Sequence, residues 1–264
     1  MRRPLDPLDD EKEGEKRDNC NEDCSLALVP FTYCNNFIDS LREESRLFFF
    51  PELDNSSITI KQRWKSGGKG GTDIGFGASV YNSSYVLSHF LSNYVSMRDK
   101  NICELGCGPG LASIVAGRSH AKNVIATDGD DISVGLCKEN VELNYVSDNV
   151  SAVRLRWGES NHDEILNVRE NYLRNQNIDY IIASDVVALP YQEAYNELLY
   201  TLQELSSSET EVILVYQRRH SSESAFFDKF EEKFQVERAP REMVPRDFRS
   251  QPIYIYKAIL KDRG

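Results

Sequence analysis

The stretch Asn101-Ile-Cys-Glu-Leu-Gly-Cys-Gly-Pro-Gly110 places a short apolar run directly before three closely spaced glycines. Residues Ile102 to Leu105 have the composition of a buried strand, and the apolar run from Leu111 to Ala116 continues as a helix. Glycines let the backbone turn sharply and approach a ligand that a Cβ atom would block. The stretch therefore predicts a strand, a turn and a helix whose free backbone N–H groups face a polar or anionic ligand.

The spacing of Gly106, Gly108 and Gly110 distinguishes between two kinds of ligand. A dinucleotide-binding fingerprint is G-x-G-x-x-G, whereas this chain has G-x-G-x-G, with Glu104 two residues before the first glycine. This pattern favours S-adenosylmethionine over NAD. A glycine-rich loop that serves only as a strand-to-helix turn is the alternative interpretation.

A second apolar run, Asn123-Val-Ile-Ala-Thr-Asp128, also ends in an acid. In a doubly wound fold an acid at this place holds a ribose, because a carboxylate can accept hydrogen bonds from both ribose hydroxyls. We assign this role to Asp128, which caps the strand. Asp130 and Asp131 crowd the same turn, and a solvated acidic loop is the interpretation for those two.

Further apolar runs continue the alternation of strands and helices along the chain. Strands are expected at residues 150–158, 178–187, 211–216, 234–237 and 252–260, and helices at 80–91, 134–143, 191–205 and 222–234. The alternation implies a parallel sheet, and the two neighbouring strands at the C-terminus imply one antiparallel member. The predicted fold class is therefore α/β, with a doubly wound, mostly parallel sheet of seven strands and one antiparallel strand near the C-terminus.

The chain is predicted to divide into three parts. Residues 1–24 are dense in charge and poor in apolar residues, which predicts disorder. Cys20 and Cys24 lie in this tail without a second cysteine pair or a histidine cluster, so no metal site is predicted. Residues 25–74 are expected to form a small N-terminal element with strands at 47–50 and 58–64. Residues 75–264 are expected to form the main domain.

Composition limits the partners and the location. The formal net charge is −11, from 31 basic and 42 acidic residues, which argues against a nucleic acid as the main partner. No run approaches about 18 apolar residues and the N-terminus lacks an apolar signal core, so neither a membrane span nor secretion is predicted. The six cysteines show no framework spacing, which indicates a reducing compartment. We expect a soluble monomer in the cytoplasm, with the nucleus as a second location.

Two aromatic residues and the end of one strand complete the expected site. Tyr81 lies near the start of the helix expected at 80–91, and Trp157 ends the third expected strand, where an aromatic face can cover an adenine ring. Core packing is the alternative for both residues. The fourth strand delivers Ser184 and Asp185 to the same edge of the sheet.

The ordered series of these motifs resembles the seven-strand S-adenosylmethionine-dependent methyltransferases and, within them, the protein-lysine methyltransferases of the methyltransferase 16 family. The resemblance spans residues 75–260. Its motifs are Gly75 with Tyr81, the E-L-G-x-G-x-G turn at 104–110, Thr127-Asp128, the Leu-x-Trp-Gly element at 155–158, Ser-Asp-Val-Val at 184–187, and the pattern Tyr216, Arg219, Phe226-Phe227.

The resemblance implies a Rossmann-like methyltransferase fold, S-adenosylmethionine as cofactor and a lysine-bearing protein as substrate. It implies that the cofactor is lined by Tyr81, Glu104, Gly106, Cys107, Gly108, Asp128, Trp157 and Ser184. It also implies that Asp185 begins a D-x-x-Y motif near the target amine.

The chain departs from the family pattern at two positions. Tyr81 stands where the family usually has Trp, which keeps an aromatic face. Ala188 stands where D-x-x-Y has its tyrosine, and Tyr191 lies three residues further along.

The expected reaction needs little acid–base chemistry from the protein. The sulfonium methyl group is already electrophilic, so the protein need only align a neutral amine with it. Asp185 would orient that amine and receive its charge. Two rival hypotheses are a methyltransferase for small molecules or nucleic acids on the same fold, and a catalytically silent adaptor that binds the cofactor.

Overall fold

The computed structural model describes residues 37–53, 57–63, 75–187 and 194–262 of the 264-residue chain. Residues 1–24, with Cys20 and Cys24, lie outside this part. So do Ala188 and Tyr191. The predictions made for these residues therefore stay predictions.

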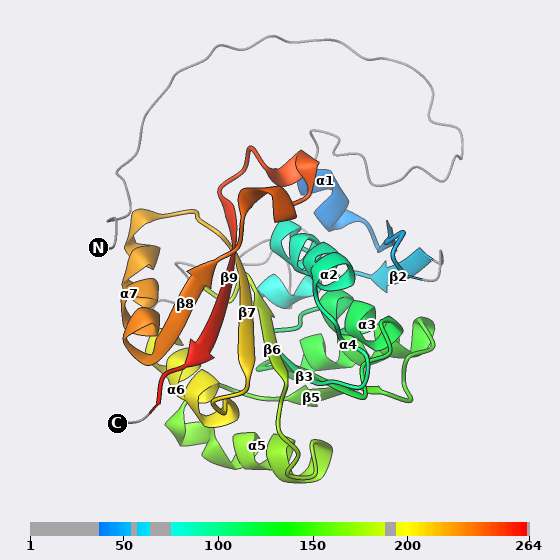
Figure 1. Cartoon of the computed structure of the whole chain (residues 1–264). Helices are drawn as coiled ribbons and strands as arrows, with labels where there is room; N and C mark the ends of the chain where they lie inside the picture. The colour runs from blue at the N-terminus through cyan, green and yellow to red at the C-terminus, as the bar shows by residue number, and fades with distance from the viewer. Residues whose placement is uncertain (1–36, 54–56, 64–74, 188–193, 263–264) are drawn as a thin grey trace, which may run out of the picture.

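A seven-stranded sheet forms the centre of the described part (Figure 1). Its strands are, in spatial order, β5 (Val150–Arg154), β4 (Asn123–Asp128), β3 (Asn101–Leu105), β6 (Tyr180–Ser184), β7 (Glu211–Gln217), β9 (Ile253–Leu260) and β8 (Phe234–Arg238). The pairs from β5 to β7 are parallel, and β9 is antiparallel to both β7 and β8. The prediction of a mostly parallel sheet with one antiparallel strand near the C-terminus is confirmed.

Helices cover both faces of this sheet (Figure 1). One face carries α2 (Asn82–Tyr94), α3 (Leu111–Arg118) and α4 (Asp131–Leu143), and the other carries α5 (His162–Asn167), α6 (Tyr195–Leu205) and α7 (Ser224–Lys233). Successive strand residues alternate between the two layers, since Val124 and Ala126 join the first core cluster and Ile125 joins the second. The near-continuous apolar strands of the sequence are therefore buried on both faces.

The N-terminal element consists of α1 (Phe37–Arg42) and the antiparallel hairpin of β1 (Ser45–Phe49) and β2 (Ser57–Lys61). This hairpin is attached to α4 by two buried asparagine side chains. Asn140 Oδ1 accepts from the Lys61 N–H at 2.8 Å, and its Nδ2 donates to the Lys61 carbonyl at 3.1 Å. Asn144 makes the same two bonds with Thr59, at 3.0 and 2.7 Å. One helical turn separates the two asparagines, so their amides meet alternate residues of β2 and act as a neighbouring strand would.

Asn140 has a third partner. Its Nδ2 also donates to the Pro109 carbonyl in the glycine turn at 2.9 Å. The same side chain therefore holds β2 and the turn that follows β3. We name Asn140 and Asn144 the asparagine pair.

Two strands end earlier than the sequence predicts. β5 stops at Arg154, not at Gly158, because the Arg156 N–H donates to Glu164 Oε2 at 2.7 Å instead of to a strand. β6 stops at Ser184 because Asp185 has a φ of 54°, in the left-handed region. Trp157 and Asp185 consequently lie in loops just beyond the carboxyl ends of their strands.

Candidate functional site

The glycine turn after β3 makes a cradle at the carboxyl edge of the sheet. Gly106 has a φ of 69°, and a Cβ atom added to it would lie 2.8 Å from Cγ1 of Val186. Only glycine fits this conformation and this spacing without strain. The same Cβ position lies 3.7 Å from Cζ2 of Trp157. The loops that follow β5 and β6 therefore both come close to Gly106.

Asp128 ends β4 beside this turn, as the sequence predicts. Its Oδ2 accepts from the Gly108 N–H at 3.0 Å, and its Oδ1 accepts from the Asp130 N–H at 3.1 Å. Burial raises the pKa of Asp128 above its ordinary value, although these two donors oppose the shift. The carboxylate is therefore fixed next to the glycine turn, at the position that can bind a ribose.

Glu104 lies under the turn and is fully buried. Its Oε2 accepts from both the backbone N–H and the hydroxyl of Ser113 on α3. Within the described ranges its Oε1 has no hydrogen-bond partner. Burial raises the pKa of Glu104 to about 8. Any contact between this carboxyl group and a ligand would therefore be made by Oε1, which is buried in this structure.

The raised pKa of Glu104 predicts a pH-dependent stability. Its ordinary pKa is 4.5 and its folded pKa is about 8, so its contribution to stability is complete below pH 4.5 and is lost as the pH rises through 8. Glu104→Gln stays neutral throughout. In urea unfolding, the free energy of unfolding of the variant should rise relative to that of the wild type as the pH increases across this window. Glu142→Gln, at an exposed position on α4, is the control, and a difference independent of pH would contradict the assignment.

Cys107 contributes its backbone, and not its thiol, to the surface of the glycine turn. The side chain is buried in the core beside Cys137 of α4, and a hydrogen bond with that thiol, together with burial, raises the pKa of Cys107 far above its ordinary value. Its N–H donates to the Thr127 carbonyl at 2.8 Å. Cys107 therefore shapes the turn from below.

Tyr81 lies directly before α2 and caps the N-terminus of that helix with its backbone. Burial raises the pKa of Tyr81 to about 12, with Arg219 opposing this shift and Asp185 adding to it. The hydroxyl therefore stays protonated at neutral pH, and both charged groups lie near it. The residue before it is fixed as well, since Arg46 of β1 donates to the Val80 carbonyl at 2.8 Å.

Asp185 is held by three neighbours. Its Oδ1 accepts from the Ser83 hydroxyl at 2.8 Å and from the Gln217 N–H at 3.0 Å. The Arg219 guanidinium donates to both carboxylate oxygens, at 3.2 and 2.9 Å. Burial disfavours the charged guanidinium, but the charge of Asp185 outweighs it and raises the pKa of Arg219. The carboxylate is therefore oriented, and its side chain is only 11% exposed.

A second carboxylate stands behind this pair. Glu223 is fully buried and accepts from the Tyr216 hydroxyl and from the backbone N–H groups of Arg219 and His220. These bonds fix the start of the segment after β7. The guanidinium of Arg219 is therefore positioned from its own backbone as well as by Asp185.

Trp157 and Ser184 complete the edge. Trp157 is partly buried against the core cluster that contains Leu155, and its carbonyl accepts from the Asn161 amide at 2.8 Å. Ser184 is the half-buried last residue of β6. The ring of Trp157 therefore borders the cradle at Gly106 while part of it packs on the core.

The position of Trp157 predicts how two substitutions behave. Trp157→Ala should weaken S-adenosylmethionine binding by about 1–3 kcal/mol, by analogy with base–aromatic stacking, and Trp157→Phe should keep most of the affinity. Isothermal titration calorimetry measures both. A core tryptophan behaves differently, because its removal costs about 3–5 kcal/mol of folding free energy with or without ligand. A strongly destabilised protein without ligand would therefore overturn the adenine assignment.

The sequence did not single out every residue of this site. Ser83 reaches it only through the packing of α2, and no local pattern marks it, whereas Val186 belongs to the Ser-Asp-Val-Val motif at 184–187. Arg219 and Glu223 also act here. The family pattern includes Arg219, so the sequence marked this residue. The sequence did not predict its contact with Asp185, because that contact depends on the pairing of β6 with β7.

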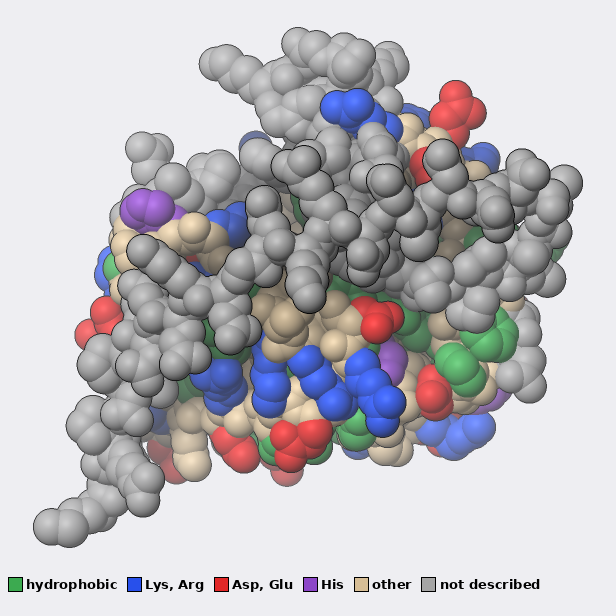
Figure 2. Space-filling model, turned by 90° about the horizontal axis from the view of Figure 1, so that it is seen from above, with side chains coloured by type: hydrophobic (Ala, Val, Ile, Leu, Met, Phe, Trp, Pro, Cys, Tyr) green, Lys and Arg blue, Asp and Glu red, His purple; other side chains and the backbone are tan. Residues whose placement is uncertain are grey.

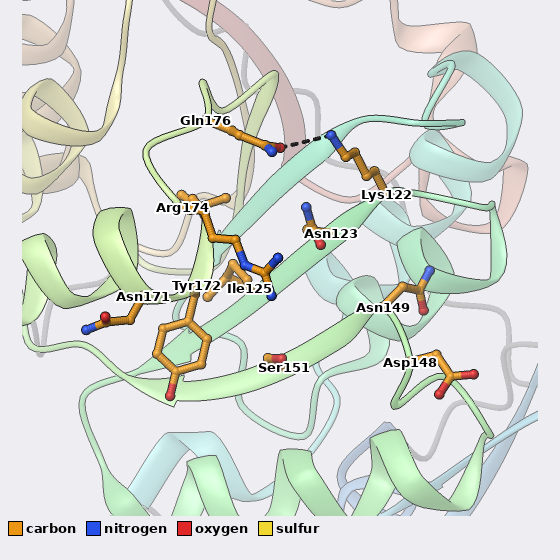
Figure 3. Close-up of a pocket in the computed structure, with 11 residues that line it drawn as sticks. Lys122, Asn123, Ile125, Asp148, Asn149, Ser151, Asn171, Tyr172, Arg174 and Gln176 are labelled. Carbon is orange, nitrogen blue, oxygen red and sulfur yellow. Dashed lines mark hydrogen bonds between the residues drawn. The ribbon is translucent and has the colours of Figure 1, made fainter.

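A separate hollow lies at the opposite edge of the sheet, at the amino ends of β4 and β5 (Figure 3). Its volume is about 340 Å³, and its lining is mostly polar and includes Lys122, Asn149, Arg174 and Gln176. Figure 3 shows Lys122 pointing toward Gln176, with which it makes a 3.0 Å hydrogen bond. This hollow is remote from Asp185 because amino and carboxyl strand ends lie on opposite edges.

The residues at the carboxyl edge fit S-adenosylmethionine. The cradle at Gly106 has no room for a Cβ atom, so its backbone is not covered by a side chain of its own, and Asp128 can bind ribose hydroxyls once it exchanges its bond with Gly108. The hidden Oε1 of Glu104 lacks a partner among the described residues and is free to form a hydrogen bond. Asp128, Trp157 and the glycine turn would hold the nucleoside, and Glu104 would act from below.

The fold is shared with solved methyltransferases. A S-adenosylmethionine-dependent methyltransferase of Agrobacterium tumefaciens matches with a TM-score of 0.51 and 16% identity, over 83% of this chain and 70% of that one. A 16S rRNA methyltransferase of T. thermophilus, in complex with AdoMet and guanosine, matches with a TM-score of 0.53 and 14% identity, over 84% and 52%.

Sequence comparison identifies the family. A family model described as lysine methyltransferase matches residues 52–233. Protein-lysine methyltransferase METTL21E of Mus musculus is 36% identical over 196 residues, which are 71% of this chain and 73% of that protein. Protein N-lysine methyltransferase METTL21A of Danio rerio is 30% identical over 238 residues, or 89% and 96%. The chain therefore belongs to the lysine methyltransferase family.

Proposed function

We propose that this S-adenosylmethionine-dependent methyltransferase transfers methyl groups to the ε-amine of a lysine in a protein substrate. The observation that carries the proposal is the carboxylate of Asp185, which Ser83 and Arg219 orient close to Tyr81 at the carboxyl edge of the sheet. Relatives named as protein-lysine methyltransferases support a protein substrate. The net charge of −11 disfavours nucleic acid as the main partner.

The residues around Asp185 prepare the amine for transfer. S-adenosylmethionine, when bound, supplies an electrophilic methyl group. Asp185 accepts a hydrogen bond from the substrate amine and thereby orients the lone pair of the amine nitrogen for transfer. Arg219 and Ser83 keep the carboxylate of Asp185 fixed. A free lysine has a pKa of about 10.4, so it loses its proton to water as the site desolvates it. Tyr81 remains a neutral donor and excludes water with its ring.

The test is a transfer assay with isotope-labelled S-adenosylmethionine and a cell lysate. Label should enter the protein fraction and, after hydrolysis, should be recovered as methyl-lysine. Label that enters only nucleic acid or small molecules would favour the first rival function. The absence of transfer together with intact cofactor binding would favour the adaptor.

The proposal extends to location and assembly. Cys103, Cys107 and Cys137 are free and buried, which suits a reducing compartment, and we propose the cytoplasm, with the nucleus as a second location. No helix in the described ranges has the length and apolar character that a bilayer span requires. We propose a monomer, which analytical ultracentrifugation can test.

A further inference from the structure

Five arginines lie at the end of β8 or in the segments that follow β7 and β8, and both strands end at the same edge of the sheet as β6, which precedes Asp185. Seen from above, the molecule shows a row of Lys and Arg side chains, with Asp and Glu side chains near it (Figure 2). We name the arginines of these segments the arginine surface: Arg218, Arg238, Arg241, Arg246 and Arg249. Arg241 is half-buried and the other four are exposed.

None of these five arginines is paired with a carboxylate in the part of the chain that the structure describes. Every ion pair found there involves other residues. Glu237, Glu242 and Asp247 are close in sequence, yet none of them lies within ion-pair distance of these arginines. The surface is thus an unneutralised cluster of positive charge on a chain whose net charge is −11.

Two of the five side chains, Arg241 and Arg249, are held in place by hydrogen bonds. Arg241 donates to the carbonyls of Phe248, Arg249, Gln251 and Ile253. Arg249 donates to the Val244 carbonyl at 2.8 Å and to that of Glu242.

Aromatic contacts and repulsion between like charges also act on the arginines of this surface. The Arg238 guanidinium carbon lies 4.1 Å from the centre of the Tyr254 ring. Burial and the nearby charges of Arg238 and Arg249 lower the pKa of Arg241, so these cations lie close enough to repel one another. A rigid group of like charges gains most from an anionic partner, because little side-chain entropy is lost when that partner binds.

We propose that the arginine surface binds an acidic segment of the protein substrate, close to the lysine that is methylated. The inference rests on the proposed function for its role, since the surface would dock the chain that supplies the amine. Charge complementarity carries the choice of partner. A protein segment is favoured over nucleic acid because the rest of the chain is acidic and would repel a long phosphate backbone.

Strand order sets the distance between the acidic segment and the lysine. From β6, which precedes Asp185, to β8, which ends at Arg238, there are three strand spacings in the order β6-β7-β9-β8. At about 4.8 Å each, they cover roughly 14 Å. An extended peptide rises about 3.3 Å per residue, so the acidic residues should begin about four residues from the lysine.

The experiment measures binding of a fluorescein-labelled decaglutamate peptide by anisotropy. The test variant is Arg218→Glu/Arg238→Glu/Arg246→Glu, which leaves the backbone-bonded Arg241 and Arg249 intact. The matched control is Lys122→Glu/Lys138→Glu/Arg174→Glu, which changes the net charge equally at exposed positions elsewhere. Unchanged affinity for S-adenosylmethionine and an unchanged melting temperature verify that both variants fold.

The wild type and the control should bind decaglutamate with a salt-dependent Kd, and the test variant should bind at least about tenfold more weakly. Asp185→Asn should bind as the wild type does. Equal binding by the wild type and the test variant would overturn the proposal. It would also be overturned if the wild type used these arginines for single-stranded RNA or anionic lipid vesicles and ignored decaglutamate.

Two peptides then test the spacing in the transfer assay. Each contains one lysine followed by four alanines, and ends either in four glutamates or in four glutamines. The glutamate peptide should show a KM at least about tenfold lower, and the test variant should lose this advantage without a change in kcat. Equal KM values would contradict the docking role. If no protein lysine is methylated at all, the proposed function fails, while the decaglutamate result still decides whether the arginine surface binds acidic chains.

Discussion

Replacing Asp185 by asparagine should lower kcat by about 100-fold, because a small misplacement of the amine has an effect of this order. Asparagine keeps the size of the side chain but removes the charge that holds Arg219 through both carboxylate oxygens. The affinity for S-adenosylmethionine should change much less than kcat, since Asp128, Trp157 and the glycine turn belong to other loops. Single-turnover kinetics in the transfer assay and calorimetry measure the two quantities.

Two further variants separate catalysis from folding. Asp148→Asn, at an exposed position on the opposite edge, should leave kcat unchanged. Arg219→Lys keeps the positive charge but cannot bind both oxygens at once, so it should lose part of the rate. If Asp185→Asn retained its full kcat, Asp185 would have no part in methyl transfer.

Replacing Asn140 by alanine should reduce the free energy of unfolding by about 3 kcal/mol, the largest loss of stability that we expect from a single polar side chain here. The amide is fully buried and serves the Lys61 N–H, the Lys61 carbonyl and the Pro109 carbonyl. Removing it leaves these backbone groups without their partner, and each buried unsatisfied group costs about 1–3 kcal/mol. Urea denaturation provides the measurement.

A suitable control is Asn171→Ala, since Asn171 is exposed and donates only to Asn167 in the described part of the chain. Its loss should stay within about 0.5 kcal/mol. The Asn140 variant should also bind S-adenosylmethionine more weakly, because the same amide fixes the turn at Pro109. A variant as stable as the wild type would show that β2 is held by other contacts.

Much of the fold was predictable from the sequence because its signals are local. The apolar runs at β3, β4, β6 and β7 are buried on both faces, and β3 and β4 are each followed by a glycine. The ends of strands were harder to predict. The apparent strand at 150–158 stops at Arg154, because the Arg156 N–H donates to the side chain of Glu164 on α5 and not to a strand.

The candidate site was predictable where a residue follows a strand directly. Asp128 and Asp185 lie at the same edge because parallel strands end together. The residues that hold them were not predictable. Ser83 reaches Asp185 from a helix far away in the sequence, and the asparagine pair bonds to β2 through backbone groups, which leave no trace in residue type. The roles of the cofactor-lining residues stay predictions.

The place of β9 in the sheet has a consequence for synthesis of the chain. β9 lies between β7 and β8, although it follows both of them in sequence. While the ribosome is still making β9, β7 exposes one edge of unpaired backbone groups to solvent and β8 has no partner in the sheet. Unpaired strand edges invite association with other chains. The nascent protein should therefore need a chaperone, or a pause in growth, until β9 leaves the ribosome and closes the gap.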